Sequence, residues 1–311
     1  MDGRLQVFAG TANPALSKAI CTELEVDEGR AIVGQWKNGE SRIKLEENVR
    51  GSDVFVIQPT CHPVNHNLME LLLMIDALKR ASAQRITAVI PYYGYAKQEK
   101  KTSGREPISA KLVANLISVA GADRVLTVDL HSPAIEGFFD LPVDHLRATP
   151  LLARAFRQDV HDDIVVVSPD AGGVQRAEDF RRRAGGGLAI ISKQHPDADT
   201  TETVEMVGDV DGKVAVIVDD MVSTGGTLVE AANLLKERGA SRVHVCATHG
   251  IFADDAIDRI EASPIDEILV TDTIPLPEHG KGRVRVVSLA PLLAEAIMRT
   301  HRNLSISALF T

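Results

Sequence analysis

Short, continuous runs of β-branched and other apolar residues recur along this chain of 311 residues, and they constrain its fold more than any other feature. Between them lie stretches with helical periodicity, such as residues 67–79, where Leu68, Leu71 and Ile75 fall on one side. A second helix is expected from Pro107, in its first turn, to Gly121, which ends it. Continuous apolar strands that alternate with helices are typical of parallel sheets covered by helices on both faces. We therefore predict an α/β protein with strands at residues 54–57, 86–90, 125–128, 164–167, 188–191 and 214–218.

The length of the chain suggests two α/β domains, at roughly 100–200 residues per domain. Residues 142–150 carry no strong periodicity and separate two series of strands and helices. We predict an amino-terminal domain over residues 1–146 and a carboxyl-terminal domain over residues 147–311. The terminal stretch 293–307 is able to pack back on the first domain.

The composition argues against several classes of protein. Lys and Arg number 34 against 43 Asp and Glu, and a net charge of −9 opposes a general nucleic-acid-binding surface. No apolar run approaches the roughly 18 residues of a membrane span, and the first residues lack the pattern of a secretory signal. Cys21, Cys61 and Cys246 lie too far apart for a disulfide framework or a paired-cysteine zinc site. We expect a cytoplasmic protein that binds neither nucleic acid nor membranes.

The strongest local motif follows the apolar run at residues 214–218. Two carboxylates, Asp219 and Asp220, are expected at the carboxyl end of this strand, before a turn rich in hydroxyls and glycine that leads into a helix. Backbone N–H groups at a helix N-terminus bind phosphate, and neighbouring carboxylates suit ribose hydroxyls or a hydrated magnesium ion. The motif therefore predicts a site for a phosphorylated sugar. The alternative, a turn in which Thr and Gly serve only the backbone geometry, leaves the paired acids unexplained.

Three further residues are candidates for a site. Trp36 is the only tryptophan of the chain, and it either packs in a turn or offers a flat surface for stacking. His131 and Asp170 each follow an apolar run, at the strand ends where the sites of parallel sheets gather. A lone histidine in such a place is more often structural than a ligand, so the residues alone leave its role open.

The motif at residues 219–227 resembles the phosphoribosyl-pyrophosphate (PRPP) motif of type I phosphoribosyltransferases and of ribose-phosphate pyrophosphokinases, also called PRPP synthetases. The rest of the chain is similar to the second family, in the right order and over nearly its whole length. The matching segments are residues 48–51, 67–71, 86–96, 111–115, 120–125, 128–131, 168–170 and 271–275.

This resemblance implies two tandem phosphoribosyltransferase-like domains, usually assembled as a homohexamer. It also implies the transfer of the β,γ-diphosphoryl group of ATP to the C1 hydroxyl of ribose 5-phosphate. The products, PRPP and AMP, would serve nucleotide, histidine, tryptophan and NAD biosynthesis. An ADP or phosphate effector is implied as well, with Arg50, Ser305 and Ser307 retained.

The resemblance also assigns the site residues. It gives the ribose 5-phosphate site to Asp219, Asp220, Ser223, Thr224, Gly225, Gly226 and Thr227. It gives the ATP site to Trp36, Asn38, Gly39, Glu40, Lys97 and Gln98. Mg²⁺ is expected to accompany ATP at His131 and Asp170, and the catalytic residues are expected to be Lys193 and His195 in a loop that runs to about residue 210.

Some positions depart from the family pattern. Ser223 and Asn38 stand where Asp is usual, and Lys97 and His195 stand where Arg is usual. A neutral histidine supplies less positive charge near pH 7 than an arginine. One alternative is therefore a weakly active or inactive regulatory subunit. A second alternative is a phosphoribosyltransferase, in which the segment 36–40 and His131 would have no role.

Overall fold

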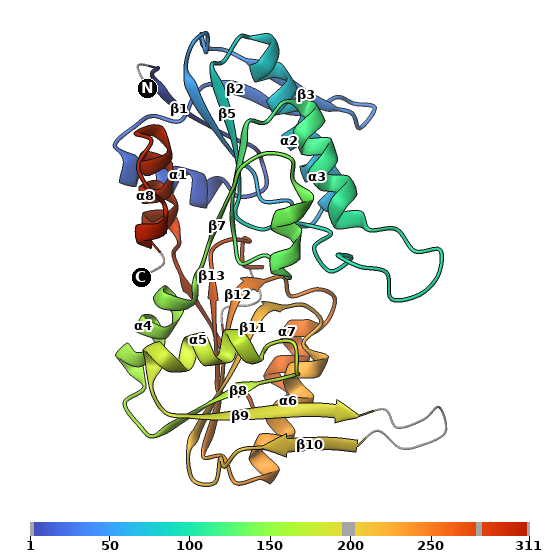
Figure 1. The fold of residues 1–311 in the computed structure, drawn as a ribbon, viewed down its shortest axis with the longest axis vertical. Coiled ribbons are helices and arrows are strands. Elements are labelled where there is room, and N and C mark those ends of the chain that lie inside the picture. Colours follow the sequence, from blue (N-terminus) through green and yellow to red (C-terminus); the bar gives the residue numbers. More distant parts are fainter. Residues whose placement is uncertain (1–2, 195–202, 278–281, 310–311) are drawn as a thin grey trace. The chain divides into compact units, whose positions relative to one another are not determined.

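The computed structural model of the protein describes residues 3–194, 203–277 and 282–309 (Figure 1). The chain forms two compact units. Unit 1 comprises Met1–Arg147, Thr273–Pro275 and Ser288–Thr311, and unit 2 comprises Ala148–Asp272 and Leu276–Val287. Each unit is built on its own mainly parallel sheet, which confirms the predicted α/β class.

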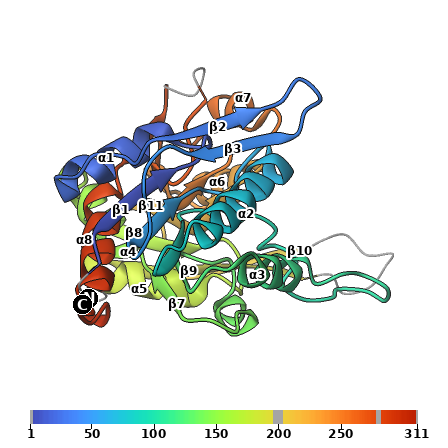
Figure 2. The same ribbon diagram turned by 90° about the horizontal axis from the view of Figure 1, so that it is seen from above.

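The sheet of unit 1 has five parallel strands. Their order is β1 (Leu5–Ala9), β4 (Asp53–Ile57), β5 (Arg85–Ile90), β6 (Arg124–Val128) and β7 (Val143–Leu146). Every residue of β4 is buried, and helices over the sheet explain why its apolar run is continuous rather than alternating. An antiparallel hairpin of β2 (Ala31–Gln35) and β3 (Ser41–Leu45) forms a separate small sheet, and Figure 2 shows its turn projecting at the edge of unit 1.

The helices of unit 1 bury their apolar sides. In α2 (Val64–Arg80), Leu68, Leu71 and Ile75 are buried, as the periodicity predicts, and the helix packs on β4, β5 and α3 (Ser109–Ala120). Gly121 ends α3 with a left-handed φ of 114°. The prediction that Pro107 lies in the first turn of this helix is wrong, because α3 begins at Ser109 with Ile108 as its N-cap residue. A 3₁₀ helix, η1 (Pro133–Phe138), follows β6.

The carboxyl-terminal segment of the chain belongs to unit 1. There, α8 (Ala290–His301) packs against α1 (Pro14–Leu24), and a short 3₁₀ helix, η3 (Ser307–Leu309), follows it. A buried ion pair fixes α8 to the sheet: Arg85 donates to Asp53 from Nε at 2.7 Å and from Nη2 at 2.5 Å. The same Nη2 donates to the carbonyl of Thr300 at 2.9 Å, and His301 Nδ1 lies 2.8 Å from Asp53 Oδ2.

The sheet of unit 2 has seven strands. Their order is β10 (Thr203–Val207), β9 (Gly187–Gln194), β8 (Ile164–Ser168), β11 (Val214–Val222), β12 (Arg242–Gly250), β13 (Glu267–Thr271) and β14 (Val284–Val287). All neighbours are parallel except β9 and β10. Figure 1 shows α4 (Thr149–Asp159) and α5 (Val174–Ala184) on one face of this sheet, and α6 (Gly226–Glu237) and α7 (Ala256–Glu261) on the other.

The cysteines and the helices agree with the predictions from the composition. All three cysteines are buried and unpaired, as expected. Across residues 3–194, 203–277 and 282–309, none of the helices combines the length and the apolar character that crossing a membrane requires.

Candidate active site

The paired acids of unit 2 lie inside β11. They lie in its carboxyl-terminal part, as predicted, but the predicted strand end at residue 218 is too early, because β11 continues past the acids: Met221 pairs with His249 and Val222 with Gly250 of β12. Asp220 is buried, with 4% of its side chain exposed, and Asp219 keeps 22%. The strand therefore carries both carboxylates into a setting with little water.

Arg176, in the first turn of α5, holds this acid pair. Its Nη1 donates to Asp219 Oδ1 at 2.9 Å, and its Nη2 lies 3.5 Å from Asp220 Oδ1. The backbone N–H of Asp220 donates to the same oxygen of Asp219 at 2.8 Å. Burial raises the pKa of Asp219 to about 7, the charge of Asp220 adds to this rise, and Arg176 opposes it. Asp219 consequently gains or loses its proton near neutral pH.

The turn after β11 leads into the N-terminus of α6. Gly225 is the N-cap residue of α6 and adopts a left-handed φ of 75°, a conformation that other residues rarely adopt. Gly225 has no side chain to accept the N–H groups of the first turn of α6, where Gly226 and Thr227 lie. Ser223 is partly buried and Thr224 is exposed, so both hydroxyls border this helix end. The structure thus brings the whole predicted sugar-phosphate motif together, as a turn that joins the acid pair to a helix N-terminus.

Asp170 lies in the loop after β8, the strand that pairs with β11. Its Oδ1 accepts the backbone N–H of Gly173 at 2.8 Å, and Ser168 Oγ donates to its carbonyl at 2.7 Å. Because β8 and β11 are parallel neighbours, their carboxyl ends meet at one edge of the sheet. Asp170 therefore belongs to the same edge as the acid pair, with Arg176 just beyond it on α5.

In unit 1, the turn of the β2–β3 hairpin carries Trp36, Asn38, Gly39 and Glu40. The backbone N–H of Trp36 donates to Glu40 O at 2.8 Å, and Asn38 Oδ1 accepts the N–H of Glu40 at 3.2 Å. Trp36 is 53% exposed, so the alternative that it packs in the turn is wrong. The Arg42 guanidinium carbon lies 4.6 Å from the centre of its ring, a cation–π contact.

Lys97 and Gln98 lie in the loop between β5 and α3, and both are exposed. The carbonyl of Gln98 accepts the N–H of Ala110 at 3.3 Å, and its side-chain Oε1 accepts the Ser109 hydroxyl. The start of α3 thus fixes Gln98. The structure places these two residues and the tryptophan hairpin in the same unit.

His131 follows β6, and it lies in unit 1, whereas Asp170 lies in unit 2. In the parts of the chain that the structure describes, no three His, Cys, Asp or Glu side chains gather as ligands for a metal ion. A single carboxylate can suffice for a Mg²⁺ ion that arrives with a nucleotide, because such ions keep several waters and phosphate oxygens and need few protein ligands. Asp170 suits this use: its Oδ1 is engaged by Gly173, and its second oxygen remains for a cation.

The two predicted catalytic residues, Lys193 and His195, lie on either side of residue 194, where the first described range ends. Lys193 is in β9, where it pairs with Val204 of β10. His195 lies outside the described residues. Both assignments therefore stay predictions.

Two protein-family models match the chain, one in its amino-terminal part and one in its carboxyl-terminal part. The model for the N-terminal domain of ribose phosphate pyrophosphokinase covers residues 5–121, and that for the phosphoribosyl synthetase-associated domain covers residues 196–311. A ribose-phosphate pyrophosphokinase of Caldanaerobacter subterraneus is 52% identical over 309 residues, which span 99% of this chain and 98% of the relative. The chain belongs to the ribose-phosphate pyrophosphokinase family.

Other ribose-phosphate pyrophosphokinases support the same assignment. That of Aquifex aeolicus is 50% identical over 312 residues and covers 100% of both chains. The crystal structure of phosphoribosylpyrophosphate synthetase from Mycobacterium smegmatis superposes with a TM-score of 0.91 at 46% identity, over 96% of this chain and 99% of that chain. Its close match over the whole length confirms the tandem phosphoribosyltransferase-like fold.

In this member of the ribose-phosphate pyrophosphokinase family, reasoning from the sequence missed Arg176. The signal was indirect: two adjacent carboxylates on a buried strand require a nearby positive charge. Nothing in the sequence shows which arginine supplies it, because α5 carries Arg176, Arg181, Arg182 and Arg183. Only the packing of α5 beside β8 and β11 singles out the first of them.

Proposed function

We propose that the protein is an enzyme, a ribose-phosphate diphosphokinase, which transfers the β,γ-diphosphoryl group of ATP to the C1 hydroxyl of ribose 5-phosphate. The observation that carries the proposal is the near full-length identity of 52% to a named ribose-phosphate pyrophosphokinase. The acid pair beside the turn at Gly225 supports it, since a sugar phosphate needs both hydrogen-bond acceptors and an anion site. The product PRPP would serve nucleotide biosynthesis.

In the proposed reaction, the C1 oxygen of ribose 5-phosphate attacks the β-phosphorus of ATP. A new O–P bond forms, the bond between the β-phosphorus and the α,β-bridging oxygen breaks, and AMP leaves with that oxygen. The hydroxyl proton passes to solvent or a base. The 5-phosphate would bind at the N–H groups of Gly226 and Thr227, and the ribose hydroxyls would donate to Asp219 and Asp220.

The base and polyphosphate of ATP would bind in unit 1. Trp36 offers its exposed ring for stacking on adenine, while Asn38 and Glu40 offer polar atoms to the base edge. Lys97, whose ammonium is exposed, and Gln98 would contact the phosphates. His131 and Asp170 are proposed as ligands of Mg²⁺, which would supply positive charge to the phosphates when bound. Lys193 and His195 are proposed to stabilise the transferring group.

A product assay tests this proposal. The purified protein is incubated with ATP, Mg²⁺ and ribose 5-phosphate, and AMP and PRPP are followed by chromatography. Equal amounts of AMP and PRPP are expected. If both substrates bind and neither product forms, the protein is a regulatory subunit instead. Consumption of added PRPP with a nucleobase would mark a phosphoribosyltransferase.

The role of His195 is a separate part of the proposal. Steady-state rates of His195→Arg and His195→Ala test it, and we expect kcat to rise with the added charge of arginine and to fall with alanine. An unchanged kcat in both variants would remove this residue from the catalytic set.

We further propose that the protein assembles as a homohexamer. The exposed side of α3 supports an assembly, since Leu112 is 57% exposed, Leu116 39% and Val119 80%, and these positions share one side of the helix. Native mass spectrometry would show a hexamer, and a monomer at micromolar concentration would refute it.

ADP or phosphate is proposed as an effector. Ser307 lines a cavity of about 550 Å³ in unit 1, together with the cationic side chains of Arg124 and Arg147. Titration of the activity with ADP and with inorganic phosphate tests this point. Because the reaction consumes ATP, we also propose that the protein acts in the cytoplasm.

A further inference from the structure

The turn that carries His131 is held by a histidine from the neighbouring strand. The segment after β6 runs through Asp129, Leu130 and His131, and β6 pairs with β7, which carries His145. The backbone N–H of Leu130 donates to His145 Nε2 at 2.8 Å. This bond joins the side chain of β7 to the backbone immediately before the proposed metal ligand.

The hydrogen bonds determine which nitrogen of His145 carries the proton. A backbone N–H can only donate, so Nε2 must keep its lone pair, and it also faces Arg147 Nη1 at 2.8 Å. Nδ1 is therefore the protonated nitrogen, and it donates to the Glu136 carboxylate. The ring is neutral in this arrangement, because a proton on Nε2 would face two donors. Burial lowers the pKa of His145, and the charge of Arg147 lowers it further.

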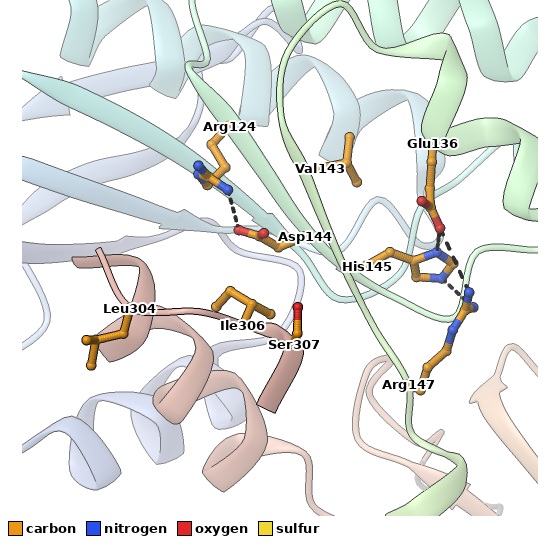
Figure 3. Close-up of a pocket in the computed structure, with 9 residues that line it drawn as sticks. All are labelled: Arg124, Glu136, Val143, Asp144, His145, Arg147, Leu304, Ile306 and Ser307. Carbon is orange, nitrogen blue, oxygen red and sulfur yellow. Dashed lines mark hydrogen bonds and ion pairs between the residues drawn. The ribbon is translucent and has the colours of Figure 1, made fainter. Parts of the chain in front are cut away.

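His145 is enclosed, whereas its partners reach the surface. Only 3% of its side chain is exposed, against 41% for Glu136 and 42% for Arg147. Figure 3 shows the three side chains in contact beside the cavity of unit 1, with the ring between the carboxylate and the guanidinium. Glu136 belongs to η1 and Arg147 follows β7, so the ring is clamped from two elements.

The turn itself needs such support. Asp129 has a φ of 37°, which is uncommon for a residue with a side chain. The N–H of Asp129 donates to Leu146 O at 3.1 Å, and Arg147 Nη1 lies 3.7 Å from Asp129 Oδ1. Backbone in an uncommon conformation persists where its surroundings fix it, and such sites are often functional. Here β7 supplies a contact to Asp129 and another to Leu130, the two residues that precede His131.

We propose that His145 is a positioning residue, which fixes the backbone at Leu130 and thereby orients His131 for the metal–nucleotide complex. The inference rests on the proposed function, because that function makes His131 a metal ligand. The hydrogen bond from Leu130 to His145 does not depend on it. Side chains that orient a metal ligand usually act on the ligand's ring, and their loss costs about 10- to 100-fold in activity or metal affinity. In this protein the orientation would act through the backbone instead.

Two substitutions at His145 distinguish the effect of its hydrogen-bond acceptor from the effect of the space that the side chain fills. His145→Gln can place an amide oxygen near the position of Nε2 and so keep the bond to Leu130, whereas His145→Leu fills the space without an acceptor. We expect His145→Leu to lower kcat by about 10- to 100-fold and to raise the Mg²⁺ concentration needed for half-maximal rate. The KM for ribose 5-phosphate should stay unchanged, since its proposed site lies in unit 2. His145→Gln should recover most of kcat.

His244→Leu is the matched control. His244 is also a buried histidine, and its Nδ1 lies 3.6 Å from Glu267 Oε2, away from both proposed substrate sites. It lies in β12 of unit 2, so its replacement should leave kcat within about twofold of the wild type. If His145→Gln loses as much kcat as His145→Leu, or if His145→Leu keeps full kcat, the proposal is wrong.

Two measurements need no turnover. Hydrogen–deuterium exchange of the free protein should show the Leu130 amide exchanging about tenfold faster in His145→Leu than in the wild type and in His145→Gln. The ¹⁵N spectrum of histidine-labelled wild-type protein, assigned by the signal lost in His145→Gln, should show His145 protonated at Nδ1 alone. Protonation at Nε2, or an unchanged Leu130 amide, overturns the proposal. If the protein makes no PRPP, but the exchange of the Leu130 amide and the ¹⁵N spectrum are as expected, the proposed function is refuted. The hydrogen bond between Leu130 and His145 is then still supported.

Discussion

The clearest consequence of the acid pair is a pH dependence that Arg176 controls. In the wild type, ribose hydroxyls need an ionised acceptor, and the pKa of Asp219 is raised to about 7 by burial and by Asp220. Therefore kcat/KM for ribose 5-phosphate should rise as the pH increases through about 7, because this ratio reports ionisation in the free enzyme. Replacing Arg176 by Met removes the charge that opposes the raised pKa.

The size of the effect follows from the contact. A hydrogen bond between charged groups contributes about 1.5–3 kcal/mol, and the lower end applies because a quarter of the Arg176 side chain is exposed to solvent. About 1.4 kcal/mol corresponds to a tenfold change in the ionisation equilibrium. Arg176→Met should therefore move the rising limb of the profile upward by about one pH unit. At pH 7 it should lower kcat/KM by about fivefold, because the ionised fraction of Asp219 falls from about one half to about one tenth. Arg176→Lys should show an intermediate profile, since it keeps the charge but not the planar fork.

The assay measures initial rates from pH 6 to 9.5, at saturating ATP and Mg²⁺, for the wild type and each variant. Arg182→Met is the control: it removes the same charge from α5, but its hydrogen bond is to Glu178 at the surface. The titration of the substrate phosphate, near about pH 6, is common to all of these proteins. A rising limb at the same pH in Arg176→Met and in the wild type would refute the reasoning.

The dependence of protein stability on pH also reports the raised pKa of Asp219. Folded Asp219 keeps its proton up to about pH 7, whereas an unfolded Asp loses it near about pH 3.9. The folded state binds more protons between these values, so this group's contribution to stability is lost as the pH rises from about 4 to about 7. In Arg176→Met the loss should extend to higher pH, and thermal melts across this range measure it.

Further predictions concern the hairpin, the buried ion pair and the turn. Trp36→Ala should raise the KM for ATP by roughly tenfold, because stacking on a base contributes about 1–3 kcal/mol, without lowering Tm, since the ring is 53% exposed. Asp53→Asn should lower the free energy of urea unfolding by about 3–5 kcal/mol, because it leaves the guanidinium of Arg85 without its buried partner. Gly225→Ala should cost about 1 kcal/mol of stability at its φ of 75° and raise the KM for ribose 5-phosphate. An unchanged KM for ATP, an unchanged unfolding midpoint and an unchanged KM for the sugar would contradict these three in turn.

The strands were predictable because burial on both faces leaves a mark in the sequence. Each of the predicted apolar runs lies within a strand, for example residues 214–218 within β11. The end of β11 was not predictable, since a pair of acids ordinarily marks an exposed loop. Here the pairing of Met221 and Val222 with β12 extends the strand, and Arg176 offsets the buried charge.

The site was predictable where its residues are adjacent in the sequence. The turn from Ser223 to Thr227 is one continuous motif, and the structure folds it as a unit. By contrast, Arg176 meets Asp219 across 43 positions, and His145 meets Leu130 across 15. No local pattern encodes such contacts, because they depend on which strands become neighbours.

The division of the chain bears on the order in which the protein can be made. Unit 2 is an insertion that is complete once Val287 has been synthesised, whereas unit 1 needs residues from Ser288 onward. Its first strands are made long before α8, the helix that packs on α1. The sheet of unit 2 therefore needs nothing that follows Val287, whereas Asp53 and Arg85 of unit 1 lack the carbonyl of Thr300 and the ring of His301 until those residues are added. A released chain that ends just before Ser288 would accordingly contain every strand of unit 2 but lack α8 of unit 1.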